Sequence, residues 1–112
     1  MSFCAALPFF NNAVAGAAVD VKPSDFAHLF SLKLVNTTGS TAYLQFFDQP
    51  AASVVLGTTA PKWVVRLAPN ESTNPSDLDP PVEFRGTGLS IAGTTTPTGS
   101  TGAAIGVSLT FG

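Results

Sequence analysis

The sequence predicts an all-β fold: a single antiparallel β-sandwich or jelly-roll-like domain with an extended apolar N-terminal arm. The clearest observation is the stretch 105–112, where large apolar side chains alternate with small or polar ones without a break. This period of two is typical of a strand with one buried face. Similar segments recur at a spacing of about ten residues, separated by Gly, Pro, Ser and Thr, and no stretch of helical length is amphipathic. A chain of 112 residues has the length of one domain.

The first half of the chain supplies the arm and the first strands. Residues 1–12 form the expected arm, and the sandwich domain is expected to span residues 13–112. Small and β-branched residues at 13–22 favour an extended edge segment. Residues 28–36 alternate, and a short turn rich in Thr, Gly and Ser leads into a strand at 43–48 with apolar groups on both faces. The sequence therefore predicts a hairpin between these two strands.

The second half alternates strands with proline-rich or threonine-rich segments. Residues 54–56 are expected to cross between strands, and four prolines predict an irregular loop at 69–81. The threonine-rich segment 93–102 is expected to be a solvated loop tip, with a contact loop as the alternative. Alternation predicts strands at 62–67, 82–85, 89–92 and 105–112.

Composition limits the classes of function. Apolar residues make up 45% of the chain and charged residues only 11%, well below the roughly 25% of soluble domains. The surface must then be built largely from Ser, Thr, Asn, Gly and Ala, which suits contact with other protein. A net charge of −2 with scattered cations excludes nucleic-acid binding as the main role, because phosphates require a basic surface.

The single cysteine and the apolar segments indicate where the chain folds. Cys4 has no intramolecular partner, which fits synthesis in a reducing cytoplasm. The apolar N-terminus has no cationic region and is interrupted by Pro8, unlike a signal peptide. No apolar run approaches the roughly 18 residues of a membrane span, so we expect no membrane partner.

Groups for covalent catalysis are sparse. His28 is the only imidazole and Cys4 the only thiol, and the cysteine lies in an apolar arm without a positioned base. We expect His28 to be an ordinary strand-end residue and the protein not to be an enzyme. No phosphate loop, nucleophile elbow or paired-histidine motif occurs, so we expect no cofactor and no metal.

The carboxylates leave two weaker alternatives open. A calcium site could use the acidic residues of the proline-rich loop, although Asp and Asn near proline usually begin turns. A carboxylate pair for glycoside cleavage could come from Asp48 and Glu83, which lie on separate predicted strands. The loop carboxylates are Glu71, Asp77 and Asp79.

The aromatic residues suggest contacts with other molecules. Trp63 and Tyr43 could form a platform for sugar stacking, but both occupy strand positions where core or interface aromatics are expected. The arm is the sharper candidate, because its bulky side chains bury enough surface to offset their ordering only when they dock. Docking onto the chain's own domain and docking onto a neighbour both remain open. The predicted protein-interface residues are Phe3, Leu7, Phe9 and Phe10.

The order of features from about residue 19 onward resembles a widespread type of small virion protein. A strand ends in Asn at 34–36, and a Tyr-led strand closes in Asp at 43–48. A Gly-Thr-x-x-Pro element at 57–61 precedes the apolar strand 63–67, and Gly-Leu-Ser-Ile at 88–91 runs into threonines. These elements, in this order, resemble those of head decoration or cement proteins of tailed bacteriophages.

That resemblance implies a β-sandwich that is usually oligomeric, often trimeric, and seated where major capsid protein subunits meet. The expected function is therefore a capsid cement or decoration protein that stabilises the phage head across those subunits, with the capsid surface of the virion as its location. A tail, baseplate or fibre component of the same virion is one alternative. A carbohydrate-binding β-sandwich module is the other.

Overall fold

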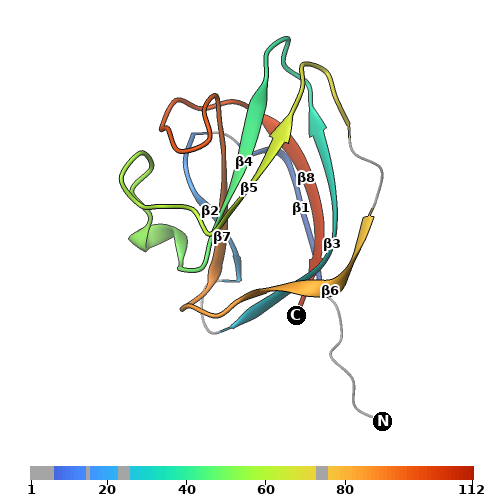
Figure 1. Ribbon diagram of the computed structural model, residues 1–112, viewed down its shortest axis with the longest axis vertical. Helices are drawn as coiled ribbons and strands as arrows, with labels where there is room; N and C mark the ends of the chain where they lie inside the picture. Colours follow the sequence, from blue (N-terminus) through green and yellow to red (C-terminus); the bar gives the residue numbers. More distant parts are fainter. Residues whose placement is uncertain (1–6, 15, 23–25, 73–75) are drawn as a thin grey trace.

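The computed structural model describes residues 7–14, 16–22, 26–72 and 76–112, which form two four-stranded antiparallel sheets packed face to face (Figure 1). The strand order is β1-β8-β3-β6 in one sheet, here called sheet A, and β2-β7-β4-β5 in the other, sheet B. The predicted fold class is confirmed. The elements are β1 (Leu7–Val14), β2 (Val19–Lys22), β3 (Ala27–Asn36), β4 (Ala42–Phe47), the short 3-10 helix η1 (Ala51–Ser53), β5 (Trp63–Leu67), β6 (Ser76–Phe84), β7 (Leu89–Thr94) and β8 (Ile105–Phe111).

The strand order is that of a jelly roll. β1 pairs with β8, β2 with β7, β3 with β6 and β4 with β5, so the chain doubles back on itself around the β4–β5 connection. This long two-stranded ribbon is then rolled up, and the pairings β3–β8 and β4–β7 complete the two sheets. Consecutive strands from β1 to β4 consequently alternate between the sheets, as in the double Greek key of jelly rolls.

The predicted hairpin between residues 28–36 and 43–48 is wrong. β3 lies in sheet A and β4 in sheet B, so the turn between them crosses the sandwich. The buried Asn36 side chain directs the crossing: its Nδ2 donates to the carbonyls of Ser40 and Ala68, at 2.8 and 2.9 Å. A turn-forming sequence fixes a change of direction, but the sheet that receives the next strand depends on such distant contacts.

One further element prediction needs correction. Residues 76–81, expected in an irregular loop, belong to β6, an edge strand that tolerates prolines because only one side of it is paired. Pro80 and Pro81 lie where the register with β3 jumps from Val82 to Asp77. Residues 54–56, expected to cross between strands, belong to the long connection that contains η1 and joins the neighbouring strands β4 and β5 of sheet B.

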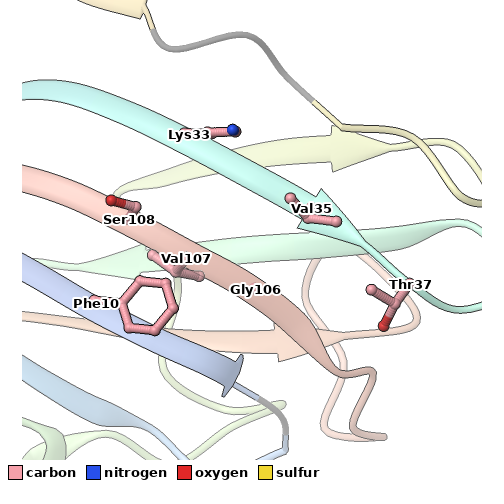
Figure 2. A pocket seen from close by; sticks show the side chains of 7 residues that line it. All are labelled: Phe10, Lys33, Val35, Thr37, Gly106, Val107 and Ser108. Atoms are coloured by element: carbon pink, nitrogen blue, oxygen red, sulfur yellow. The ribbon is translucent and has the colours of Figure 1, made fainter.

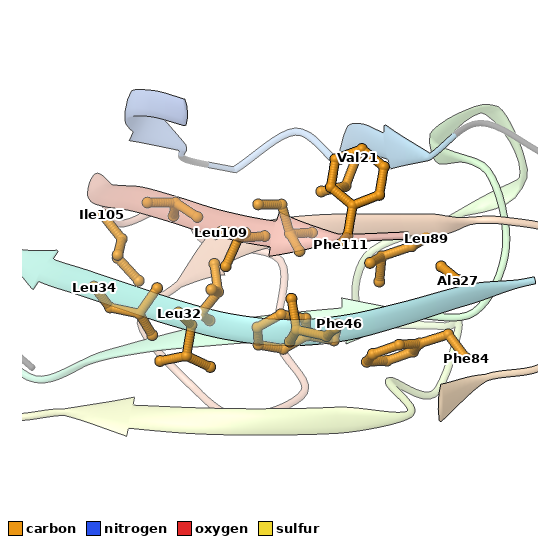
Figure 3. Close-up of a cluster of buried hydrophobic side chains, with 14 of the residues drawn as sticks. Val21, Ala27, Leu32, Leu34, Phe46, Phe84, Leu89, Ile105, Leu109 and Phe111 are labelled. Atoms are coloured by element: carbon orange, nitrogen blue, oxygen red, sulfur yellow. The ribbon is translucent and has the colours of Figure 1, made fainter. Parts of the chain in front are cut away.

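The core lies between the inner faces of the sheets (Figure 3). Phe46 is fully buried at its centre, with ring centroids 4.9 Å from Trp63 and 5.9 Å from Phe84. β8 runs between β1 and β3 with the predicted alternation: its large apolar side chains are buried and its small ones face outward. The buried side chains of β8 are Ile105, Val107, Leu109 and Phe111.

Part of the expected N-terminal arm is an edge strand of sheet A. β1 is antiparallel to β8, with Phe9 opposite Leu109 and Phe10 opposite Ser108. The expected boundary between arm and domain, after residue 12, therefore falls inside β1. Residues 1–6, including Phe3 and Cys4, lie outside the described residues.

Candidate functional site

The two sheets differ in what covers their outer faces. On sheet B, side chains that point away from the core are nevertheless buried, including Gln45 at 0% and Phe47 at 1% exposure. Ser90, Ala92 and Thr94 of the neighbouring β7 are equally buried. The predicted two-sided apolar character of the strand at 43–48 is therefore satisfied within this chain.

Two loops are anchored on that face. Gln45 Nε2 donates to Thr94 Oγ1 at 2.6 Å and to the carbonyl of Gly99 at 3.2 Å, which holds the threonine-rich loop against the sheet. The β4–β5 connection is held by Ser90 Oγ, which donates to the carbonyl of Gln49 at 2.8 Å. Figure 1 shows both loops beside β2, β7 and β4. The threonine-rich loop thus has exposed side chains but is also a cover for sheet B.

The outer face of sheet A carries an open groove of about 360 Å³ (Figure 2). Phe10, Ser108 and Lys33 lie side by side across three strands, followed by the pair Gly106 and Val35. Gly106 has no side chain, which leaves a hollow beside the Phe10 ring. The groove is lined by Phe10, Lys33, Val35, Thr37, Gly106, Val107 and Ser108.

Phe10 is the main apolar group at this groove. It is 70% exposed, more than any other large apolar residue whose exposure the structure describes. Phe9, its neighbour in sequence, points to the opposite side and packs against the core. Leu7 belongs to β1, but its side chain, like all of Phe3, lies outside the described part of the chain. Of the four predicted interface residues, the structure therefore places Phe10 alone on an exposed surface that it describes.

The titratable groups of the described residues do not converge on one site. His28 Nε2 lies 3.4 Å from Glu83 Oε2, and Arg85 Nε donates to Glu83 Oε1 at 3.2 Å, in an exposed row across β3 and β6. Exposed ion pairs of this kind contribute about 0–1 kcal/mol to stability. The predicted alternatives based on Cys4 stay untested because that residue is not described.

The carboxylates are dispersed. Glu71 Oε1 accepts a hydrogen bond from the Ala68 amide at 2.6 Å and so closes the turn after β5. Asp77 and Asp79 belong to β6, and their side chains are not described. In the described ranges, no group of three or more His, Cys, Asp or Glu side chains is placed to hold a metal ion.

Trp63 and Tyr43 do not form a common platform. Trp63 is opposite Phe46 in the β4–β5 ladder and packs with it on the inner face of sheet B. Tyr43 is an odd number of positions from Phe46 along β4, so its ring points to the other face. A sugar cannot stack on both rings, which removes the observation that favoured a carbohydrate-binding module.

Comparison with protein-family models, with curated proteins and with solved structures found no match to this chain. Among the helices of the described residues, none has the length and apolar character needed to cross a membrane. The groove itself was not predicted. The alternation of residues 105–112 did place Gly106 and Ser108 on the outward face, but their position beside Phe10 depends on β1 pairing with β8, which no local pattern indicates.

Proposed function

We propose that this protein is a virion structural protein, a capsid cement or decoration protein that binds across major capsid protein subunits of a phage head. The observation that carries this proposal is the open groove on the outer face of sheet A, where Phe10 stands exposed. An exposed aromatic ring next to a hollow is typical of a protein–protein contact. Among the described residues that line the groove, Lys33 is the one with a charged side chain.

The fold supports the same proposal by analogy. Jelly rolls are used by viral capsid domains, although lectins and cupins also use them, so the topology alone does not decide the function. The low content of charged residues, 11%, favours a surface that is covered in an assembly. The proposed partner is the major capsid protein, the proposed location is the capsid surface, and no cofactor is required.

The mechanism is linkage between binding and assembly. A protein that binds only the assembled shell stabilises it in proportion to the logarithm of its free concentration over the dissociation constant. At a free concentration of 100 times that constant, each occupied site gains about 2.7 kcal/mol. Non-covalent contacts that span two subunits are sufficient for this effect.

The first test is the copy number of this protein in purified particles of the source virus, measured by quantitative mass spectrometry against the major capsid protein. A number in the hundreds, in a simple ratio to the capsid subunit, would support a cement protein. A number between a few and a few tens would support the tail, baseplate or fibre alternative, and absence from particles would refute both.

The second test asks which face binds. Ser108 and Val55 are both exposed, but Ser108 lies in the groove and Val55 lies in the β4–β5 connection. In addition of purified protein to undecorated particles, we expect Ser108→Arg to abolish binding and Val55→Arg to leave it unchanged. Equal binding by both variants would refute a role for the groove.

A further inference from the structure

The two sheets have four edge strands, and three of them carry features that hinder pairing with another chain. β6 contains Pro80, Pro81 and three acidic residues. β2 has only four residues, among them Asp20 and Lys22, and the five-residue β5 includes the exposed Arg66. Short length, prolines and charges are the means by which proteins block association of sheet edges.

β1 has none of these features except a proline near its start. It is eight residues long, contains no charged residue, and carries the exposed Phe10. Its strand partner in the described structure is β8 on one side, and the order of sheet A places no strand on the other. Pro8, the second residue, lies where a strand tolerates proline best, at the beginning of an edge strand. This combination is typical of an edge that pairs with another strand.

We propose that two copies of this chain associate through β1, antiparallel across a two-fold axis, so that sheet A continues from one copy into the other. A second copy fits because an uncharged strand meets itself without repulsion, and a two-fold axis brings the same surface of both copies together. The inference concerns self-association and does not depend on the proposed role in a virion. It also differs from the trimer that the sequence resemblance implies, since a three-fold axis cannot pair β1 with itself.

The alternation of side chains restricts the register. Residues directly opposite each other in an antiparallel ladder point to the same face, so an outward residue of β1 must meet an outward residue of the second copy. An axis at Phe10 satisfies this condition and places the two exposed rings opposite each other, a pairing that stabilises sheets. Phe10 also lies within the regular part of the β1–β8 ladder, which extends from Leu7 to Asn11 before the register shifts.

The expected interface is small. A ladder of about seven residues is roughly 24 Å long and a sheet with its side chains is about 10 Å thick, so each copy buries roughly 240 Å², about 500 Å² in total. This total is below the roughly 1,000 Å² of stable specific interfaces and is typical of weak association. We therefore expect a reversible dimer with a dissociation constant in the upper micromolar range.

Sedimentation equilibrium of the purified full chain tests the proposal between about 1 μM and 1 mM. We expect the wild type to dimerise, and Phe10→Lys and Phe10→Glu to bind at least about tenfold more weakly because like charges then face each other. An equimolar mixture of the two variants should regain dimerisation. Val55→Lys, at a side chain that is 59% exposed in the β4–β5 connection, is the matched control and should dimerise like the wild type.

Three results would overturn the proposal: a monomeric wild type throughout this range, a trimer, or Phe10 variants that associate as the wild type does.

Cross-linking in a Cys4→Ser background then tests the register without adding charge. Opposite Cα atoms in a ladder are about 4.5–5.5 Å apart, within disulfide range, so Phe10→Cys should form a covalent dimer on oxidation. Ser108→Cys is the control, because three strand spacings of about 4.8 Å would separate its two sulfurs, and it should stay uncross-linked. Failure of Phe10→Cys to cross-link, or cross-linking of Ser108→Cys, would overturn it.

Discussion

Replacement of Asn36 by alanine should be the most damaging single change at a polar residue of this fold. Its side chain is 1% exposed and connects the turn after β3 with the turn after β5. Nδ2 donates to the carbonyls of Ser40 and Ala68, while Oδ1 accepts hydrogen bonds from the amide and hydroxyl of Thr38, at 3.0 and 2.7 Å. Nδ2 also lies 3.4 Å from the carbonyl oxygen of Leu67, and alanine removes all five interactions at once.

The size of the effect follows from these bonds. A net contribution of about 1 kcal/mol for each of the four shorter bonds, reduced because water can reach some of the exposed partners, gives a loss of about 3 kcal/mol. The unfolding entropy near the melting temperature is about 0.24 kcal/mol per kelvin for 112 residues. The melting temperature of Asn36→Ala should therefore fall by about 12 °C.

Thermal unfolding followed by circular dichroism measures this shift. Gln49→Ala is the matched control, because it removes an amide that makes one exposed hydrogen bond to the carbonyl of Ser53, and it should cost about 0.5 kcal/mol. Asn36→Asp keeps the acceptor of Thr38 but turns a carboxylate toward two carbonyls, so it should destabilise at least as much as alanine. A shift below about 4 °C for Asn36→Ala would refute the role assigned to this side chain.

Three further changes test the core, a close backbone contact and the cover of sheet B. Gly86→Ala should prevent folding or cost more than about 3 kcal/mol in urea unfolding, because its Cβ would lie 1.8 Å from the Asp48 carbonyl oxygen. Gly39→Ala is the control: a Cβ at this position would have no neighbouring atom within 4 Å, so stability should change by less than about 1 kcal/mol. Equal stability of these two variants would contradict the packing of Gly86. Gln45→Leu should let proteinase K cleave the threonine-rich loop several-fold faster, and an unchanged cleavage rate would show that Gln45 does not anchor it. Phe46→Ala should cost about 3–5 kcal/mol in the same urea assay, whereas a loss below about 2 kcal/mol would place Phe46 outside the centre of the core.

The sequence was sufficient to predict the fold class and most strands, because both depend on local alternation. The terminal strand shows this best: its buried and outward residues are those that period two predicts. Local patterns gave the wrong result where a distant contact decides the outcome. The turn after β3 has the composition of a hairpin turn, yet Asn36 bonds to Ala68 and guides the chain into the other sheet.

Prolines led to the other large error. Four of them between residues 69 and 81 predicted a loop, although an edge strand with an irregular register accepts prolines. Whether a segment will be an edge strand is a property of the sheet order and not of the segment. The same reason explains why the groove on sheet A could not be predicted: its walls come from β1, β3 and β8, whose adjacency is a result of the rolled-up topology.

In the structure, the feature that favours assembly lies on sheet A and not on the strand at 43–48. Two apolar faces on the strand at 43–48 indicated an interface, but Gln45 and Phe47 are buried beneath the chain's own loops. The outer face of sheet B is therefore covered over much of β4 and β7, and its edge strands are short or charged. Sheet A differs on both counts, since its outer face is open at the groove and β1 is an uncharged edge. Phe10 belongs to both features. A partner on the face of sheet A and a second copy along β1 would consequently both contact this ring. Phe10→Lys should therefore weaken both associations. Ser108→Arg should weaken only the binding of a partner to the face and leave the dimer unchanged.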